Sequence, residues 1–340
     1  MNVSRGRRDS GMPALAAYYA VAICLALAVL AGRASGGGEI EKARHYSLVG
    51  DWQRAAGLYE EASAGGLGRE DMDRLAEAYY YLGKTDKAAE VIDRALKLSD
   101  SLPTRILRAL VDAQREAPEG PLSVLSRMLS GGRDDFRVYA AMGMISMRSD
   151  TKKALEYFNR SIELNPDCFD AWYYSGVIHE EAEEFEEATK AYQQAVKINP
   201  LFARAQNNLG YSFKERHFYA YAVERYLKAI ELMPDHAGFY YNLGNAYTHQ
   251  EKIDEAFEAY RKAVELEPSF AKAHYNLGRT YLRKDKVREA INEFRLYLKY
   301  GNSAVFSFVS PAAAVEDEIS QLEYYLKYNS ARPTQKGIAR

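Results

Sequence analysis

The sequence predicts an all-α solenoid of stacked helical hairpins, preceded by an N-terminal transmembrane or signal helix and closed by a C-terminal capping helix. Three observations predict this fold class: an uncharged apolar run at 13–31, a period of 34 residues over the second half of the chain, and an amphipathic stripe behind the last repeat. The formal net charge of -2 lacks the basic excess typical of a nucleic-acid binder, so we expect no nucleic-acid partner.

The N-terminal part has a basic flank at 1–12, an apolar segment at 13–32 and a glycine-rich tether at 33–38. A helix over residues 13–31 would extend about 28 Å, close to the thickness of a bilayer's hydrocarbon core. This length favours a retained membrane anchor, whereas a cleaved signal peptide stays open because Ala31 and its neighbours suit a signal peptidase.

Basic residues on both sides of the apolar run bear on its topology. Those before it favour a cytoplasmic N-terminus and an extracytoplasmic body, periplasmic or equivalent, but those behind it keep a cytoplasmic body open. The residues are Arg5, Arg7 and Arg8 before the run and Arg33, Lys42 and Arg44 behind it.

Three residue types recur every 34 residues through the second half of the chain. They are Gly176, Gly210, Gly244 and Gly278; Ala188, Ala222, Ala256 and Ala290; and Pro166, Pro200, Pro234 and Pro268. Counted from Phe169, Ala203, Ala237 and Ala271, each unit consists of two antiparallel helices joined by a short turn. Gly at the eighth position and Ala at the twentieth allow the two helices to approach closely, so a bulkier residue would clash.

The segment YYNLGNAY at 240–247, followed by EAFEAYRKAVELEP at 255–268, resembles a consensus unit of the tetratricopeptide repeat family. The resemblance is close over 169–304 and weaker in the earlier units, and it covers most of the chain. It implies a right-handed solenoid whose function is to bind protein or peptide partners rather than to catalyse a reaction.

The predicted organisation after the tether follows from these units. Two divergent units occupy 39–102, a degenerate helical hairpin 103–134, five units 135–304, a linker and capping helix 305–328, and a disordered tail 329–340. In the hairpin at 103–134 we expect Pro121 at the first position of the second helix, with a hinge as the alternative. In the capping helix Val315, Ile319, Leu322 and Leu326 form one apolar stripe that would shield the last hairpin.

The second, fifth, sixth and ninth positions of each first helix point away from the hairpin seam, and in the tetratricopeptide family this face lines a concave groove. The candidate peptide-binding residues are Tyr173, Tyr174, Asn207, Asn208, Tyr211, Tyr241, Asn242, Asn245, Tyr275, Asn276 and Arg279. The amides of Asn208, Asn242 and Asn276 would hydrogen-bond an extended peptide backbone, similar to the asparagine ladder of O-linked N-acetylglucosamine transferase. The alternative is that these residues merely brace neighbouring units.

A carboxylate clamp for chaperone C-termini, present in some members of the family, is not matched. Asn207, Tyr211 and Asn276 stand where the clamp needs Lys, Asn and Arg. Glu180 and its neighbours make the early groove acidic, while Lys214 and Arg283 make the later groove basic, which would orient a ligand.

No catalytic, cofactor or metal site is predicted. The triplet Gly83-Lys84-Thr85 lacks the upstream glycine of a phosphate loop, because Ala78 stands there, and it fits the turn of a repeat better. The six histidines lack metal-ligand spacing, and His179 and His274 fall in the hairpin seam, where hydrogen-bonded core residues are expected.

The leading hypothesis is therefore a non-enzymatic scaffold or adaptor at the cell envelope that binds partner proteins or extended peptides. The alternative is a non-catalytic subunit that recruits substrate to an envelope enzyme complex. A helical-repeat RNA binder ranks third, because the composition is slightly acidic.

Overall fold

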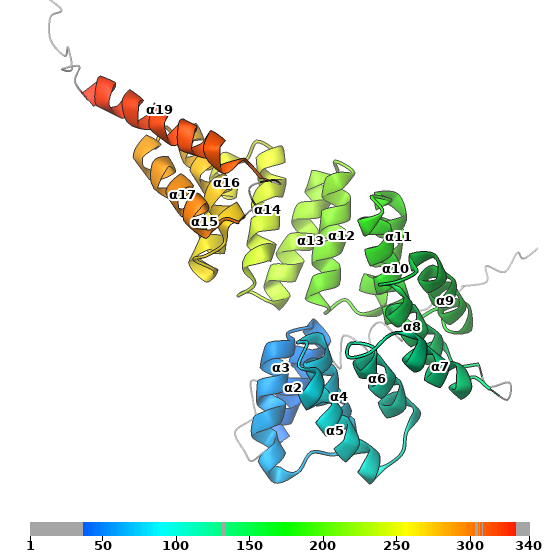
Figure 1. Ribbon diagram of the computed structural model, residues 1–340. Helices are drawn as coiled ribbons and strands as arrows, with labels where there is room; N and C mark the ends of the chain where they lie inside the picture. The colour runs from blue at the N-terminus through cyan, green and yellow to red at the C-terminus, as the bar shows by residue number, and fades with distance from the viewer. Residues whose placement is uncertain (1–36, 131–133, 303–304, 306, 308, 331–340) are drawn as a thin grey trace, which may run out of the picture. The chain divides into compact units, whose positions relative to one another are not determined.

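The computed structural model describes residues 37–130, 134–302 and 309–330, together with residues 305 and 307. These residues form seventeen α-helices and one short 3-10 helix, without a strand (Figure 1). The predicted all-α solenoid of helical hairpins is thereby confirmed. The chain divides into two compact units, which meet in the sequence at Ala171 and Trp172. We refer to them as unit 1 and unit 2.

Unit 1 contains the earlier hairpins. Its helices are α2 (Gly37–Val49), α3 (Trp52–Ala62), η1 (Ser63–Gly65), α4 (Arg69–Tyr81), α5 (Thr85–Leu98), α6 (Leu102–Asp112), α7 (Glu119–Met128), α8 (Phe136–Ser146) and α9 (Thr151–Leu164), with the first residues of α10 (Phe169–Glu181). Unit 2 contains the rest of α10, α11 (Phe185–Ile198), α12 (Ala203–Glu215), α13 (Tyr219–Leu232), α14 (Ala237–His249), α15 (Ile253–Leu266), α16 (Ala271–Arg283), α17 (Val287–Tyr300) and α19 (Ala312–Ser330).

The predicted register of the repeats is confirmed, because α10, α12, α14 and α16 begin at the four expected first positions. The regular 34-residue spacing of glycine has a direct packing cause in each of these four hairpins. A Cβ added at Gly176, Gly210, Gly244 or Gly278 would lie 2.6, 2.9, 2.5 or 2.7 Å from the nearest heavy atom that would meet it, the ring of Tyr192, Tyr226, Tyr260 or Phe294. These rings are buried, so the glycine makes room for an aromatic residue of the second helix.

The turns inside the four hairpins of unit 2, and one turn of unit 1, use a left-handed residue at the fifteenth position. In unit 2 these residues are Glu183, His217, Glu251 and Asp285, with φ between 58 and 64°. In unit 1 Gly83 holds the same position of its hairpin, at φ 68°. Lys84 is the N-cap of α5 and Thr85 is its first residue, so Gly83-Lys84-Thr85 forms the turn between two helices.

Two side chains at the fourth position of the hairpin seam are hydrogen-bonded. Of the two histidines expected in the seam, His274 is a core residue: it is buried, its Nδ1 lies 2.7 Å from Glu293 Oε2, and its Nε2 lies 3.0 Å from the Pro268 carbonyl. His179 is only partly buried, and its Nδ1 lies 2.6 Å from Glu184 Oε2. Gln206 has the position equivalent to that of His274, two repeats earlier, and donates to the Pro200 carbonyl at 2.9 Å. A side chain at the fourth position thus ties its helix to the turn before it.

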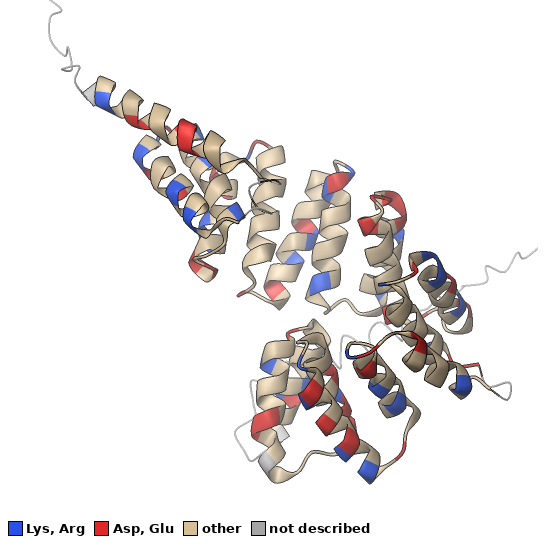
Figure 2. Cartoon of the chain, viewed as in Figure 1, with Lys and Arg blue, Asp and Glu red and all other residues tan. Residues whose placement is uncertain are grey.

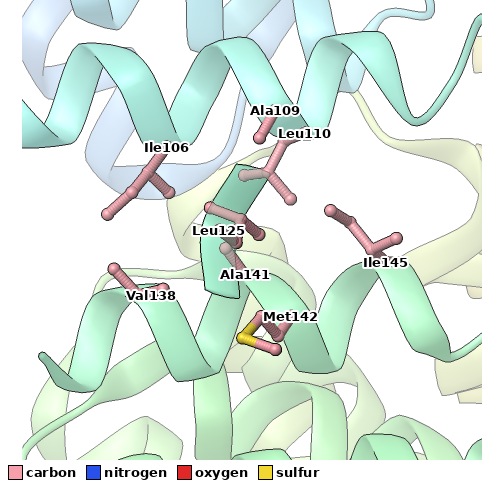
Figure 3. Close-up of a cluster of buried hydrophobic side chains, with 8 residues drawn as sticks. All are labelled: Ile106, Ala109, Leu110, Leu125, Val138, Ala141, Met142 and Ile145. Atoms are coloured by element: carbon pink, nitrogen blue, oxygen red, sulfur yellow. The ribbon is translucent and has the colours of Figure 1, made fainter. Parts of the chain in front are cut away.

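The segment at 103–134 forms a hairpin, as predicted, but its second helix begins earlier than expected. Helix α7 starts at Glu119 with Pro118 as its N-cap, so Pro121 is the third helical residue rather than the first. Proline is tolerated there because the first four N–H groups of a helix have no intrahelical acceptor. The hairpin packs on α8 through a buried cluster (Figure 3). The cluster comprises Ile106, Ala109, Leu110, Leu125, Val138, Ala141, Met142 and Ile145.

The predicted capping helix is confirmed as α19. Val315 and Ile319 are buried against α17, and Leu322 and Leu326 pack on the same cluster. Glu318, outside the apolar stripe of this helix, accepts a hydrogen bond from Arg279 Nη1 of α16 at 2.6 Å. The helix continues to Ser330, two residues past the predicted cap, while 331–340 lie outside the described residues.

The apolar run at 13–31 lies outside the described residues, as do residues 33–36 of the predicted tether. Helix α2 begins at Gly37, so the last two residues of that tether are helical instead. Glycine is least unfavourable at a helix terminus, which explains why Gly37 and Gly38 do not delay the helix. Among the helices that the structure describes, none has the length and apolar character needed to cross a membrane.

Candidate peptide-binding site

The eleven candidate residues all lie in unit 2, on α10, α12, α14 and α16. Arg279 is exposed and the other ten are partly buried, so the face is neither a free surface nor core. Helix α14 in the middle of this face carries no Lys, Arg, Asp or Glu and is drawn entirely in tan in Figure 2. The recognition chemistry available along α14 is therefore that of amides, hydroxyls and aromatic rings.

Side-chain amides link consecutive first helices across this face. Asn242 Nδ2 donates to Asn207 Oδ1 at 2.9 Å, and Asn276 Nδ2 donates to Asn245 Oδ1 at 2.9 Å. Asn208 Nδ2 donates to the Tyr192 hydroxyl at 3.3 Å. These bonds brace neighbouring repeats, as one of the two sequence hypotheses expects. Each amide has two donor hydrogens and two acceptor sites, so the bracing leaves capacity for a ligand.

Tyrosines at the fifth position pack between two hairpins. The Tyr173 ring lies 5.9 Å from the Tyr192 ring and 5.4 Å from the Phe202 ring, which precedes α12. The Tyr241 ring lies 6.1 Å from Tyr260 and 5.1 Å from Phe270, which precedes α16. Burial raises the pKa of Tyr173 to about 12. Tyr275 differs, because its two ring contacts, Phe294 and Tyr297, both lie on α17 of its own hairpin. These rings hold the repeats together and expose only part of their surface.

A cavity of about 270 Å³ lies at the later end of this face. It brings together three predicted residues, Asn245, Asn276 and Arg279. From the sequence, Lys214 and Arg283 were expected in a basic part of the groove, and the remaining residues were not predicted as part of the site. Its complete lining is Lys214, Asn245, Thr248, His249, Ile253, Tyr260, Asn276, Arg279, Thr280 and Arg283. This lining contains cationic side chains, amides and hydroxyls. Lys214 and Arg279 are ion-paired with Glu215 and Glu318, which lie outside the lining, so Arg283, the amides and the hydroxyls are the groups that suit an anionic or carbonyl-bearing ligand.

The earlier end of the face carries a buried carboxyl group. Burial raises the pKa of Glu180 to about 7, and its Oε2 atom is buried without a hydrogen bond among the described residues. A carboxyl group with this pKa is only partly ionised at neutral pH, so the polarity from acidic to basic along the face stays a prediction. The burial of Glu180, however, could not be predicted from its place in a run of glutamates.

Sequence reasoning missed a larger cavity, of about 510 Å³, in unit 1. The signal was available, because the second, fifth, sixth and ninth residues of α4, α6 and α8 all line it. These are Glu70, Asp73, Arg74 and Glu77; Pro103, Ile106, Leu107 and Leu110; and Arg137, Ala140, Ala141 and Met144. Asp170, the second residue of α10, lines it too. The candidate residues predicted from these four positions came only from the most regular repeats, at 169–304.

No group of three or more His, Cys, Asp or Glu residues is placed to hold a metal ion among the described residues. Cys168 is buried, and burial raises the pKa of its thiol.

Comparison with known proteins gives several matches. One curated relative, an uncharacterized protein of Methanocaldococcus jannaschii, is 40% identical over 48 residues, which are 14% of this chain and 56% of that protein. The chain thus spans about half the length of this relative. Solved structures with the same type of fold include MamA from Desulfovibrio magneticus RS-1, at 24% identity over 49% of this chain and 96% of that one, with a TM-score of 0.47.

Two more solved structures are similar over longer parts of the chain. YrrB, described as a tetratricopeptide repeat protein with an unusual peptide-binding site, is 18% identical over 60% of this chain and 97% of its own, with a TM-score of 0.48. Yeast Tom70 is 16% identical over 88% of this chain and 66% of its own, with a TM-score of 0.49.

Family models give the clearest result. Models described as "Tetratricopeptide repeat" match residues 40–73, 72–106, 148–201 and 271–300, and one described as "TPR repeat" matches 219–250 and 244–285. Together these matches include most of the repeats that the structure shows, in both units. The chain belongs to the tetratricopeptide repeat family.

Proposed function

We propose that this protein is a non-enzymatic scaffold that binds an extended segment of a partner protein along the face formed by α10, α12, α14 and α16. The observation that carries this proposal is the continuous row of amides and tyrosines on that face, which ends in the basic cavity at Lys214, Arg279 and Arg283. Tetratricopeptide proteins act as interaction scaffolds, and this face provides the directional hydrogen bonds that an extended backbone needs.

The polarity of the face supports one direction of binding. A partner segment with a basic residue near Glu180 and an acidic residue near Arg283 would meet complementary charge at both ends. Between these ends, the uncharged α14 would contact the backbone of the segment through Asn242 and Asn245.

The test is partner capture by the full chain and by a variant in which Asn208, Asn242 and Asn276 are all changed to Ala. We expect the variant to lose a partner that the wild type retains. A matched control changes Gln193 and Gln194 to Ala, two exposed amides on α11, and should retain it. Because Asn242 and Asn276 also brace neighbouring repeats, circular dichroism must show that the variant is folded. Retention of the same partner by the folded variant would exclude this face from binding.

We also propose that the scaffold acts at the cell envelope, anchored through the apolar run at 13–31. This proposal rests on the sequence, in which 19 uncharged residues follow a basic flank. Membranes from the native cell should retain the full chain after carbonate extraction, whereas a chain that starts at residue 37 should be released. Proximity labelling with a tag after residue 340 would report on which side of the membrane the repeats lie.

A further inference from the structure

The cavity of about 510 Å³ in unit 1 contains two carboxyl groups without a counter-ion. Glu77 on α4 and Asp170 at the start of α10 both line it, and neither side chain has a hydrogen bond or ion pair with any described residue. Carboxylates withdrawn from water are costly unless they are paired, so a molecule that leaves two of them facing one cavity has room for a cation there.

The arginines around the cavity already have partners. Arg69 Nη1 lies 2.7 Å from Asp73 Oδ2, Arg74 Nη2 lies 3.4 Å from Glu70 Oε1, and Arg137 Nη2 lies 2.6 Å from Asp135 Oδ2. The first two pairs occupy Asp73 and Glu70, the other two carboxylates of the lining, and Arg137 is paired with Asp135 outside it. The surplus charge of the cavity therefore resides on Glu77 and Asp170.

The electrostatics of the two groups agree with this geometry. Burial raises the pKa of Glu77 to about 7, an effect that Asp170 and Asp73 increase and Arg74 opposes. Burial alone raises the pKa of Asp170 to about 6. Both carboxyl groups would be stabilised in their charged form by a positive group placed between them.

The rest of the cavity wall is apolar. Ile106, Leu107 and Leu110 on α6 and Met144 on α8 contribute most of it, together with the rings of Tyr80 and Tyr81. Ile106, Leu110 and Ala141 also belong to the buried cluster of Figure 3, so this wall is held in place by the core behind it. A volume of about 510 Å³ is in the range of sites that enclose a small ligand or a few side chains.

We propose that this cavity is a second binding site, which takes an arginine side chain of an extended partner segment together with the apolar residue beside it. The planar guanidinium would bridge Glu77 and Asp170, and the apolar neighbour would lie against Ile106 and Met144. Arginine is favoured over lysine because its fork can donate to two carboxylates at once. This proposal rests on the proposed function, since it names partner chemistry for a further site of the same scaffold.

The test uses two fluorescein-labelled heptapeptides, acetylated and amidated, with leucine, arginine and leucine at the centre and glycine and serine at the ends. In the second peptide citrulline, a neutral isostere, replaces arginine. Fluorescence polarisation with the full chain should give at least tenfold tighter binding for the arginine peptide. A variant with Glu77→Gln and Asp170→Asn should lose this preference, while its melting temperature stays equal to or above that of the wild type.

A matched control carries Glu116→Gln and Glu119→Gln, two exposed glutamates of unit 1 that do not line the cavity. It removes the same charge and should keep the arginine preference. Equal binding of both peptides to the wild type, no binding of either, or an arginine preference that survives in the Glu77 and Asp170 variant would each overturn the proposal. The triple asparagine variant of unit 2 should keep the preference, so the two sites can fail separately.

Discussion

Gly244 on α14 lies directly against the ring of Tyr260 on α15: a Cβ added at the glycine would be 2.5 Å from Tyr260 Cε1. The Tyr260 ring is only 2% exposed and its hydroxyl donates to Asn245 Oδ1 at 2.8 Å, so it cannot move aside freely. Gly244 is thus required by one aromatic ring and by the hydrogen bond that holds that ring.

Gly244→Ala should therefore destabilise the protein although alanine is the better helix former. Overpacking against the fixed ring costs about 1–3 kcal/mol, and the gain in helix propensity returns about 1 kcal/mol, so we expect a net loss of up to about 2 kcal/mol. Urea unfolding followed by circular dichroism measures it. Gly57→Ala is the control, because nothing lies within 4 Å of a Cβ at that helical site, and it should stabilise by about 0.5–1 kcal/mol.

Glu251→Gly should stabilise the protein. Glu251 has φ 58°, which costs a residue with a Cβ about 1–2 kcal/mol, whereas glycine there costs about 0.5–1 kcal/mol in chain entropy. We expect a net gain of about 0.5–1 kcal/mol in the free energy of unfolding. Glu258→Gly, at an exposed site within α15, should instead lose about 1 kcal/mol, and a loss of that size at position 251 would contradict the prediction.

His274→Gln should change how stability depends on pH. Burial opposes the charge on His274, but the hydrogen bonds to Glu293 and the Pro268 carbonyl outweigh it, so its pKa is raised above 6.5. A raised histidine pKa stabilises the fold at low pH, and this contribution is lost as the pH rises through the folded-state value. The wild type should exceed the variant by more at pH 5.5 than at pH 8.5, in urea unfolding at both values.

Gln is a suitable replacement because Gln206 makes the equivalent bond to the Pro200 carbonyl. His249→Gln provides a control of opposite sign. Burial is the main cause that lowers the pKa of His249, so the wild type should exceed this variant by more at pH 8.5 than at pH 5.5. The same trend in both variants would show that neither histidine is responsible.

Tyr297→Phe should loosen the capping helix. The Tyr297 hydroxyl donates to the Ser310 carbonyl and accepts from the Ser310 N–H at 3.2 Å, so it holds the chain two residues before α19. We expect a loss of about 1 kcal/mol and faster hydrogen exchange of the α19 amides. Tyr328→Phe, at a site that is 60% exposed on the same helix, should leave exchange unchanged. Unchanged exchange in both variants would mean that apolar packing alone docks α19.

The repeats were predictable because their signal is backbone packing, which requires the same residue at the same position each time. Gly176 and Ala188 therefore fixed the register, and α19 followed from its apolar stripe. The start of α7 was less predictable, because proline fits several positions of a first turn and both Pro118 and Pro121 satisfy that rule.

Side-chain partners were a different matter. The spacing of Asn207 and Asn242 shows that both lie on one face, but it does not show that one donates to the other. The charge state of Glu77 depends on how deeply three other helices enclose it, which no local pattern contains. For these residues, the hydrogen-bond partners and the charge state follow only from the three-dimensional structure.

The amide bonds between α12 and α14 and between α14 and α16 have a thermodynamic consequence for any ligand. Asn242 and Asn276 have already given up rotamer freedom during folding, so association would not have to immobilise them again. Recognition on this face would then lose less entropy per contact than on a surface of free lysines and glutamates, and would depend mainly on how well the incoming backbone matches a fixed spacing of polar groups.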